Sequence, residues 1–315
     1  MRRVVVLGGA GFFGRLIVER LGAAGLNPIV ASRSHGELRI DANDGEALRA
    51  NLKTRDIVID AAGPFQKRTP ALIELARKIG FDVIDLSDSP EYTSMIYEQQ
   101  APIGAAGIRV LTACSSLSTI SALMLKATGG EQPRRLSVYL VPASRYTANP
   151  GAITSFLAGI EGSSRTIHFP PPLGTRSGIT MKSVDAITLP RIFPSLQTTE
   201  FLVDGGIPGM NLLLRLKKVR DLAAQHQSKV IKLANRIGPK RGILAYDIGS
   251  AQRRRQRIFI GENSYMLAVI PAIEAAIAIA AGRFPHRGLV PPTEHLALDA
   301  FLAAVARERI QMITV

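Results

Sequence analysis

The chain of 315 residues has no tryptophan, a single cysteine and only 5% aromatic residues. Cys114 stands alone and cannot form an internal disulfide, which favours a reducing, cytoplasmic setting over an exported one. With so few aromatic rings, the protein offers few platforms on which bases could stack, and the sequence contains no known nucleic-acid-binding motif. We therefore expect no nucleic-acid partner.

Long uninterrupted apolar runs are also missing. Residues 1–25 begin with a basic pair and an apolar run, as a signal peptide does, but charged side chains interrupt that run. The most apolar later stretch, Met266–Ala281, contains Pro271 and Glu274 and is shorter than the roughly 20 residues that cross a bilayer. We predict that it is a buried helix.

No metal-binding pattern is present. The five histidines have no common spacing and no clustered carboxylates near them in the sequence; they are His35, His168, His226, His286 and His295. We expect no metal site.

Positive charge is concentrated in the middle of the chain. Residues 1–120 carry 14 Lys and Arg against 13 Asp and Glu, residues 121–265 carry 21 against 8, and residues 266–315 carry 4 of each. This division indicates a separate, strongly basic middle domain. It also predicts an anionic neighbour for that domain, namely an acidic substrate, a membrane surface or, least favoured, nucleic acid.

The first 120 residues alternate short apolar runs with helical patterns, which is typical of a parallel sheet with crossover helices. The runs are Arg3–Leu7, Pro28–Ala31, Leu38–Ile40, Asp56–Ala61, Asp82–Leu86 and Arg109–Thr112. The helical patterns are Phe12–Ala24, Asp44–Asn51, Thr69–Ile79 and Pro90–Gln100, with Asp44 as a helix cap and Gly80 as a helix stop. Six strands in this rhythm predict a doubly wound Rossmann sheet in an α/β protein.

Beyond residue 130 the pattern predicts a mixed α/β domain. Its strand-like stretches are Leu136–Val141, Ile179–Leu189, Thr198–Leu202, Ile243–Ile248 and Arg257–Ile260. One long helix is expected at Asn211–Ile237, and the tail from Ala268 is helical with a break at Pro285–Pro292. We predict a Rossmann domain at 1–128, a mixed-sheet substrate or dimerisation domain at 129–265, and C-terminal helices at 266–315 that pack back on the first domain.

A glycine-rich loop joins the first predicted strand to the first predicted helix. Its residues are Gly8, Gly9, Ala10, Gly11, Phe12, Phe13 and Gly14, in which Gly9, Gly11 and Gly14 form G-x-G-x-x-G. The glycines allow a tight turn, a close approach of the backbone to a pyrophosphate, and close packing of the helix on the strand. The phosphates then face the N–H groups at the helix N-terminus. We predict a dinucleotide here; the alternative is a glycine turn without a ligand.

The end of the second predicted strand determines which dinucleotide binds. An NAD site has a carboxylate there for the ribose 2′-hydroxyl, whereas an NADP site has a cation for the 2′-phosphate. This chain has Ser32 and Arg33 and no carboxylate before Glu37, which favours NADP; the alternative is a solvated arginine and weakly bound NAD. After the fourth predicted strand, Ala61, Ala62 and Gly63 are small enough for the cofactor to lie flat against the backbone.

Five short motifs together resemble the saccharopine dehydrogenase-like family, in particular its bacterial members of unassigned substrate. They are Val-Leu-Gly-Gly-Ala-Gly-Phe-Phe-Gly (6–14), Ala-Ser-Arg (31–33), Ala-Ala-Gly-Pro-Phe (61–65), Val-Ile-Asp-Leu-Ser-Asp (83–88) and Cys-Ser-Ser-Leu-Ser-Thr (114–119). The resemblance covers residues 1–130 and implies NADP(H)-linked hydride transfer, with the substrate held between two domains. True saccharopine enzymes carry Asp-Pro-Gly where this chain has Ser115–Thr119, so their substrate contacts do not transfer.

The residues expected near the reacting carbon form no recognisable constellation. The candidates are Asp88, Cys114, Ser115, Arg145 and Tyr146. Asp88 could equally cap a helix, and Cys114 could be a small buried residue. No tyrosine has lysine four positions later, which excludes the mechanism of short-chain dehydrogenases. The leading hypothesis is an NADP(H)-dependent oxidoreductase for an anionic or lipid-like small molecule, and the alternative is a non-catalytic NADP(H)-binding sensor or membrane-peripheral scaffold.

The predicted helix Asn211–Ile237 is amphipathic and basic. Its apolar residues are Leu212, Leu216, Val219, Ala223, Val230, Leu233 and Ile237, and its polar side carries Arg215, Lys218, Gln225, Lys229, Lys232 and Arg236. Such a helix could lie on an anionic membrane, or it could pack its apolar side on the middle sheet with its charges in solvent. An apolar face in the middle domain could also serve as a homodimer contact.

Overall fold

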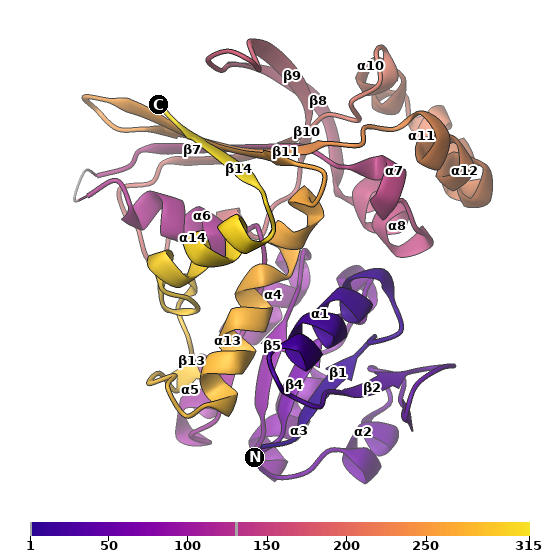
Figure 1. Cartoon of the computed structure of the whole chain (residues 1–315), viewed down its shortest axis with the longest axis vertical. Helices are drawn as coiled ribbons and strands as arrows, with labels where there is room; N and C mark the ends of the chain where they lie inside the picture. The colour runs from indigo at the N-terminus through magenta and orange to yellow at the C-terminus, as the bar shows by residue number, and fades with distance from the viewer. Residues whose placement is uncertain (1, 130–131) are drawn as a thin grey trace. The chain divides into compact units, whose positions relative to one another are not determined.

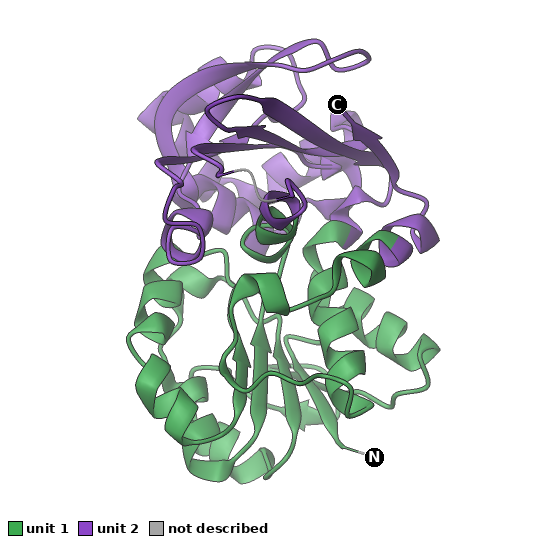
Figure 2. Cartoon of the chain, turned by 90° about the vertical axis from the view of Figure 1, so that its left-hand side faces the viewer, with its two compact units in different colours: residues 1–123, 267–302 green, residues 124–266, 303–315 purple. Residues whose placement is uncertain are grey.

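The computed structural model describes residues 2–129 and 132–315. The chain forms two compact units, shown in green and purple in Figure 2. Unit 1 comprises residues 1–123 and 267–302, and unit 2 comprises residues 124–266 and 303–315. The tail differs from the predicted arrangement, because its last thirteen residues belong to unit 2 and end in a strand of that unit.

Unit 1 contains a parallel sheet of seven strands in the order β13-β6-β5-β4-β1-β2-β3. The strands are β1 (Val4–Leu7), β2 (Ile29–Ser32), β3 (Leu38–Arg39), β4 (Ile57–Asp60), β5 (Asp82–Asp85), β6 (Arg109–Leu111) and β13 (Gly288–Leu289). The six predicted strands are all present, in Rossmann order. The seventh, β13, comes from the C-terminal segment and pairs in parallel with β6.

Every residue of β1, β4 and β5 is buried, as expected for central parallel strands covered on both faces. The helices of unit 1 include α1 (Phe12–Ala23), α2 (Gly45–Asn51), α3 (Ala71–Ile79), α4 (Pro90–Tyr97), α5 (Gln100–Ala105) and α13 (Ile270–Ala280). The side chain of Asp44 caps α2, and Gly80 ends α3 in the left-handed conformation, so both predicted helix boundaries are confirmed.

Helix α13 is the predicted buried helix. It contacts α1, β4 and β5, and Figure 1 shows α1 and α13 in front of the sheet. Seven of its residues are buried, among them Ile270, Ile273 and Ile279. Among the described helices, none is both long enough and apolar enough to cross a membrane.

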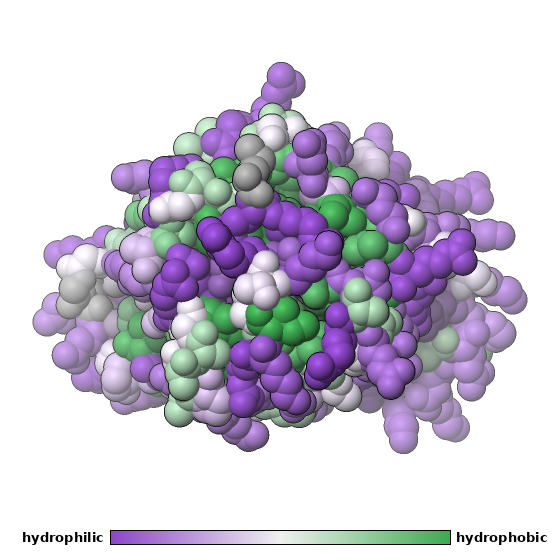
Figure 3. Space-filling model, turned by 90° about the horizontal axis from the view of Figure 1, so that it is seen from below, coloured by the Kyte–Doolittle hydropathy of each residue, from purple (hydrophilic) through white to green (hydrophobic). Residues whose placement is uncertain are grey.

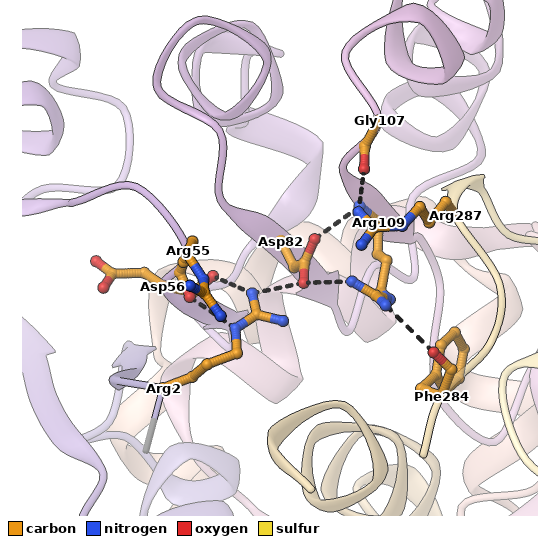
Figure 4. Close-up of polar contacts among 8 residues, drawn as sticks. All are labelled: Arg2, Arg55, Asp56, Asp82, Gly107, Arg109, Phe284 and Arg287. Atoms are coloured by element: carbon orange, nitrogen blue, oxygen red, sulfur yellow. Dashed lines mark hydrogen bonds and ion pairs between the residues drawn. The ribbon is translucent and has the colours of Figure 1, made fainter. Parts of the chain in front are cut away.

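The amino ends of the parallel strands are joined by a polar network (Figure 4). Asp82, at the start of β5, accepts from Arg2 Nη2 at 2.6 Å and from the backbone N–H of Arg109 at 2.8 Å. The Arg109 guanidinium also donates to the carbonyl of Phe284 at 3.2 Å. The network ties β6 and the C-terminal segment to the sheet at the edge opposite to the one where such sheets bind ligands.

Unit 2 contains a mixed sheet in the order β14-β12-β11-β7-β10-β9-β8. Its strands are β7 (Arg135–Val141), β8 (Ile160–His168), β9 (Thr175–Met181), β10 (Thr198–Val203), β11 (Gly242–Gly249), β12 (Arg254–Gly261) and β14 (Gln311–Thr314). Among the described strands of this sheet, only β7 and β10 pair in parallel. The predicted strand Ile179–Leu189 is wrong beyond Met181, since the chain turns there into the short helix α9 (Asp185–Thr188).

The single long helix predicted at Asn211–Ile237 is also wrong. The segment forms three helices, α10 (Met210–Arg215), α11 (Lys217–Gln225) and α12 (Gln227–Ile237). Leu216 interrupts the helix between α10 and α11 with an extended ψ of 117°. His226 interrupts it between α11 and α12 with φ −115° and ψ 40°. Helices α11 and α12 pack on α8 (Pro150–Gly159), and α12 also packs on α7 (Ser144–Thr147).

Candidate functional site

In the glycine loop after β1, backbone atoms of neighbouring segments occupy the space that side chains would need. Gly8 has φ +71°, and a Cβ atom there would lie 2.7 Å from the carbonyl oxygen of Ala61, in the loop after β4. A Cβ atom on Gly14 would lie 2.1 Å from the carbonyl oxygen of Gly8. Helix α1 can therefore approach the turn only because position 14 has no side chain. These contacts give Gly8 and Gly14 the packing roles that the motif predicts.

The N-terminus of α1 faces the loop without a side-chain cap. Gly11 is the N-cap residue, it has no side chain, and it is exposed. A Cβ atom on Gly11 would meet only the Gly8 carbonyl oxygen, at 3.1 Å, so the space on its other sides is open. The positive end of the helix dipole and its N–H groups thus stand beside a clear space, as an anion such as a pyrophosphate requires. The residues present fit a dinucleotide.

The loop after β2 presents Arg33 to solvent. Arg33 is exposed and forms no hydrogen bond or ion pair with another described residue. The Ser32 hydroxyl donates to the carbonyl of His35 and accepts from the His35 N–H, so it shapes the loop. The Glu37 carboxylate accepts from the backbone N–H of Val30 at 3.1 Å and is held on the strand. Glu37, the first acid after β2 in the sequence, is therefore engaged, and the guanidinium of Arg33 remains available for a 2′-phosphate.

The loop after β4 is held by a buried ion pair. Asp60, the last residue of β4, accepts from Arg68 Nη1 at 3.0 Å and Nη2 at 2.6 Å, and Arg68 Nη1 also donates to the carbonyl of Ala62 at 2.9 Å. Burial opposes the charged guanidinium, but the attraction to Asp60 outweighs it and raises the pKa of Arg68. Asp60 and Arg68 thereby fix the backbone of Ala61, Ala62 and Gly63, where the cofactor is expected to lie.

A second buried carboxylate ends β5. Asp85 Oδ1 accepts from the N–H groups of Ser87 at 3.0 Å and Ala113 at 2.9 Å, while Oδ2 has no partner among the described residues. Burial raises the pKa of Asp85 to about 6. Burial, reinforced by the charge of Asp85, also raises the pKa of the Tyr92 hydroxyl well above its ordinary value. A carboxyl with such a pKa at the ligand-binding edge of the sheet is a candidate proton carrier or a structural acid.

Asp88 lies exposed in the same loop. Its Oδ1 atom accepts from Gln66 Nε2 at 3.2 Å, which links the loops after β4 and β5. The side chain of Ser89, not that of Asp88, caps helix α4 by accepting from the Tyr92 N–H. The alternative role of Asp88 as a helix cap is thus taken by its neighbour, and the Asp88 carboxylate remains at the surface.

The loop after β6 is bound to the C-terminal segment. Cys114 is fully buried, and burial raises the pKa of its thiol well above the ordinary value, which favours a packing role. The Ser115 hydroxyl donates to the carbonyl of Ala268 at 2.9 Å. Thr119 Oγ1 lies 2.7 Å from His295 Nδ1, and His295 Nε2 lies 3.0 Å from the carbonyl of Val290. Burial lowers the pKa of His295 to about 4, so this histidine is neutral at neutral pH.

Arg145 and Tyr146 belong to α7 in unit 2. Arg145 Nε donates to the carbonyl of Gly238 at 3.1 Å, which connects α7 to the end of α12. Tyr146 is 43% exposed. The two residues are thus presented by a different unit from the other three candidates.

The structure adds residues that the sequence did not single out. Asp60, Arg68, Thr119 and His295 all hold loops at the carboxyl edge of the parallel sheet. The ion pair could be suspected from a charge at the end of an apolar strand, but nothing local connects Thr119 with a histidine 176 positions away. Across residues 2–129 and 132–315, no group of three or more His, Cys, Asp or Glu is arranged to hold a metal ion.

Comparison with known families gives a match to part of unit 1. Residues 4–111 match the family described as saccharopine dehydrogenase NADP binding domain. A lipid droplet localized protein of Caenorhabditis elegans is 25% identical over 195 residues, which cover 51% of this chain and 45% of that protein. The chain therefore spans less than half the length of this curated relative.

Comparison with solved structures gives matches along nearly the whole chain. A UDP-N-acetylglucosamine 3-dehydrogenase from Acidithiobacillus ferrooxidans is 15% identical with a TM-score of 0.38, covering 98% of this chain and 96% of that one. A biliverdin reductase from Synechocystis, solved with biliverdin and NADP+, is 12% identical with a TM-score of 0.38, covering 96% of each chain. Identities and scores this low carry no information about the substrate.

Proposed function

We propose that the chain, whose residues 4–111 match the saccharopine dehydrogenase NADP binding domain, is an NADP(H)-dependent oxidoreductase for an anionic or lipid-like small molecule. The observation that carries the proposal is the glycine loop, in which Gly8 and Gly14 leave no room for side chains in front of an uncapped helix. We assign the pyrophosphate to the segment Gly8–Gly14, which includes Gly9, Ala10, Gly11, Phe12 and Phe13.

We further propose that the loops after β2 and β4 hold the two ends of the cofactor. Arg33, exposed and without a protein partner among the described residues, would bind the 2′-phosphate, with Ser32 shaping its loop. Ala61, Ala62 and Gly63, fixed by the Asp60–Arg68 pair, would border the nicotinamide half. When bound, NADPH supplies a hydride to an electrophilic carbon, and the protein must supply one proton to the atom bonded to that carbon.

For the proton we propose Asp88, with Ser115 as a nearby polar contact. Asp88 is exposed at the carboxyl edge and is oriented by Gln66, whereas the thiol of Cys114 is buried with a raised pKa. We therefore place Cys114 behind the reaction site, where it supports the loop. Asp85 holds two backbone N–H groups and would keep the Asp88 loop in position.

We infer the substrate class from the excess of positive charge in the middle of the chain. Residues 121–265 carry 21 Lys and Arg against 8 Asp and Glu, which favours a substrate with a carboxylate or phosphate. Only Nε of Arg145 is engaged by a described residue, so its two terminal nitrogens could bind such a group, with Tyr146 beside them. We include lipid-like compounds in this class because the C. elegans relative is named for its localisation to lipid droplets.

The first experiment is a titration with NADPH and NADH followed by nicotinamide fluorescence, for which the absence of tryptophan keeps the protein background low. We expect tight binding of NADPH and weak binding of NADH. The loaded protein is then mixed with carboxylated and phosphorylated carbonyl compounds with short and long alkyl chains, and the loss of NADPH is followed. Binding of neither dinucleotide would overturn the proposal.

The variant Asp88→Asn separates chemistry from binding. It should bind NADPH like the wild type but lose turnover, because the amide cannot deliver a proton. The control is Glu98→Gln. It replaces an exposed carboxylate by an amide in a loop of unit 1 that does not follow a strand. Binding of NADPH without turnover of any compound would favour the alternative function, a non-catalytic NADP(H)-binding sensor.

A further inference from the structure

Apolar side chains are exposed mainly on one segment of unit 2. Nine large apolar residues are exposed in the described part of the chain, and six of them lie within residues 212–237: Leu212, Leu213, Leu216, Leu222, Leu233 and Ile237. Leu212 is 67% exposed and Leu216 is 57% exposed. By contrast, the face of the molecule in Figure 3 is mostly polar, and its apolar areas are small. We call the three helices α10, α11 and α12, with bounds Met210–Ile237, the α10–α12 segment.

The α10–α12 segment and its continuation to residue 241 are strongly basic. Nine cations occur here, against the single acid Asp221: Arg215, Lys217, Lys218, Arg220, Lys229, Lys232, Arg236, Lys240 and Arg241. Most of these cations are exposed. Solvent-exposed leucines and a high density of positive charge thus occur on the same short stretch of chain.

The packing of the segment explains why both kinds of side chain face solvent. Helices α11 and α12 rest on α7 and α8 and contain no buried residue, although the structure describes them throughout. In α12 the half-buried residues are Gln227, Val230, Ile231 and Ala234. The outer side of α12 carries Lys229, Lys232, Leu233, Arg236 and Ile237. Helices α11 and α12 therefore pack through half-buried residues on α7 and α8, where packing on the middle sheet was expected.

A cavity of about 380 Å³ lies between α8 and α11. Its apolar lining includes Leu157 and Ile160, and its charged lining consists of Lys217, Arg220 and the acid Asp221. A hydrocarbon wall beside two cations and one acid, with a net positive charge, fits the junction of a phosphate headgroup with its alkyl chain.

We propose that the α10–α12 segment is a docking surface for an anionic lipid bilayer. The exposed leucines would enter the boundary between headgroups and acyl chains, and the lysines and arginines would attract the headgroup phosphates. The charge argues against a second copy of this chain on the same face, because two strongly basic surfaces would repel each other. This proposal stands independently of the reaction, since none of its residues belongs to the dinucleotide site.

The test uses the full-length protein and vesicles of phosphatidylcholine alone or of an equal mixture with phosphatidylglycerol. We expect the protein to float with the mixed vesicles, not with the neutral ones, and to be released by salt. In Lys229→Glu/Lys232→Glu, partitioning should fall by more than about tenfold, since each basic residue near such a surface contributes a factor of about five and two are removed. In Leu216→Gln/Leu233→Gln it should fall while the salt dependence remains.

Matched controls keep the charge and polarity changes but move them elsewhere. Lys53→Glu/Lys78→Glu makes the same charge change on exposed residues of unit 1, and Met312→Gln removes another exposed apolar side chain of unit 2. Both controls should float like the wild type. Equal loss in the control and test charge variants would mean attraction by net charge alone and would overturn the proposal. It would also be overturned by a wild-type dimer that binds no vesicles and becomes a monomer in Leu216→Gln/Leu233→Gln.

Discussion

Asp85 and His295 are two buried ionisable residues at the carboxyl edge of the parallel sheet. The charged form of each opposes folding, but Asp85 becomes charged as pH rises, whereas His295 becomes charged as pH falls. Burial raises the pKa of Asp85 to about 6 and lowers the pKa of His295 to about 4. As pH falls from neutral, protonation of Asp85 relieves a penalty, while protonation of His295 would create one. The two effects on folding stability have opposite signs and occur over overlapping pH ranges. The stability of the wild-type protein therefore shows neither of them clearly.

Asp85→Asn should reveal the contribution of the Asp85 carboxylate to the pH dependence of folding stability. The amide oxygen can still accept from Ser87 and Ala113, and the amide nitrogen would occupy the place of Oδ2, which has no partner in the described structure. The wild-type residue weakens folding as pH rises through its raised pKa, so the variant should gain about 3 kcal/mol relative to the wild type between about pH 4 and pH 7. Urea unfolding of both proteins across this range measures the gain. A difference independent of pH would contradict the prediction.

Arg33 determines cofactor choice in our proposal. Arg33→Glu should weaken NADPH binding by about 10- to 100-fold, the value of one charge-assisted contact, and should leave NADH binding unchanged or tighter. Arg39→Glu makes the same charge change at another exposed residue a few positions along the chain and should have little effect. Nicotinamide fluorescence titrations measure all four affinities. Unchanged NADPH affinity in Arg33→Glu would exclude this residue from the site.

At the scale of elements, helix α1 offers a matched pair of glycine substitutions. Gly14→Ala would place a Cβ atom 2.1 Å from the Gly8 carbonyl oxygen, so the helix must move away from the loop, with loss of stability and of NADPH binding. Gly22 lies in the same helix with nothing within 4 Å of its Cβ position. Gly22→Ala should stabilise the protein by roughly 0.5–1 kcal/mol. Thermal unfolding with and without NADPH measures both effects; equal behaviour of the two variants would contradict the packing role.

The sequence predicted the elements of unit 1 far better than those of unit 2. Strands such as β4 and β5 are buried on both faces, so they are continuous apolar runs that stand out from amphipathic helices. Strand β8 was missed, because it lies at the sheet edge and most of its residues are exposed. The breaks at Leu216 and His226 were missed because apolar periodicity continues through both positions and neither residue is a strong helix breaker.

The candidate site divides in the same way. Gly8, Gly14 and Arg33 could be proposed from the sequence, because a dinucleotide imposes local spacing on the chain. The Asp60–Arg68 pair and the Thr119–His295 contact were not, because burial and long-range packing create them. Sequence patterns report what a ligand or a local element requires, while the support of a loop depends on which distant segments the fold brings together.

For the whole molecule, the division of the chain into two compact units leads us to expect that the units unfold separately. One apolar core joins residues of unit 1 such as Val5, Leu72 and Val83, and another joins residues of unit 2 such as Tyr139 and Ile258. The residues of each of these two clusters come from one unit, and we expect the two units to open separately in hydrogen exchange. This expectation can be tested with the cofactor as a selective stabiliser.

NADPH should stabilise unit 1 and leave unit 2 unchanged. At a concentration about 100-fold above its Kd, a ligand stabilises the structure it binds by about 2.7 kcal/mol. Hydrogen exchange of amides in β1, β4 and β5 should therefore slow by about two orders of magnitude, because these strands exchange only when unit 1 opens. Amides in β11 and β12 act as an internal control in the same sample. If they slow equally, the chain unfolds as one cooperative body, and the two units are not separate units of stability.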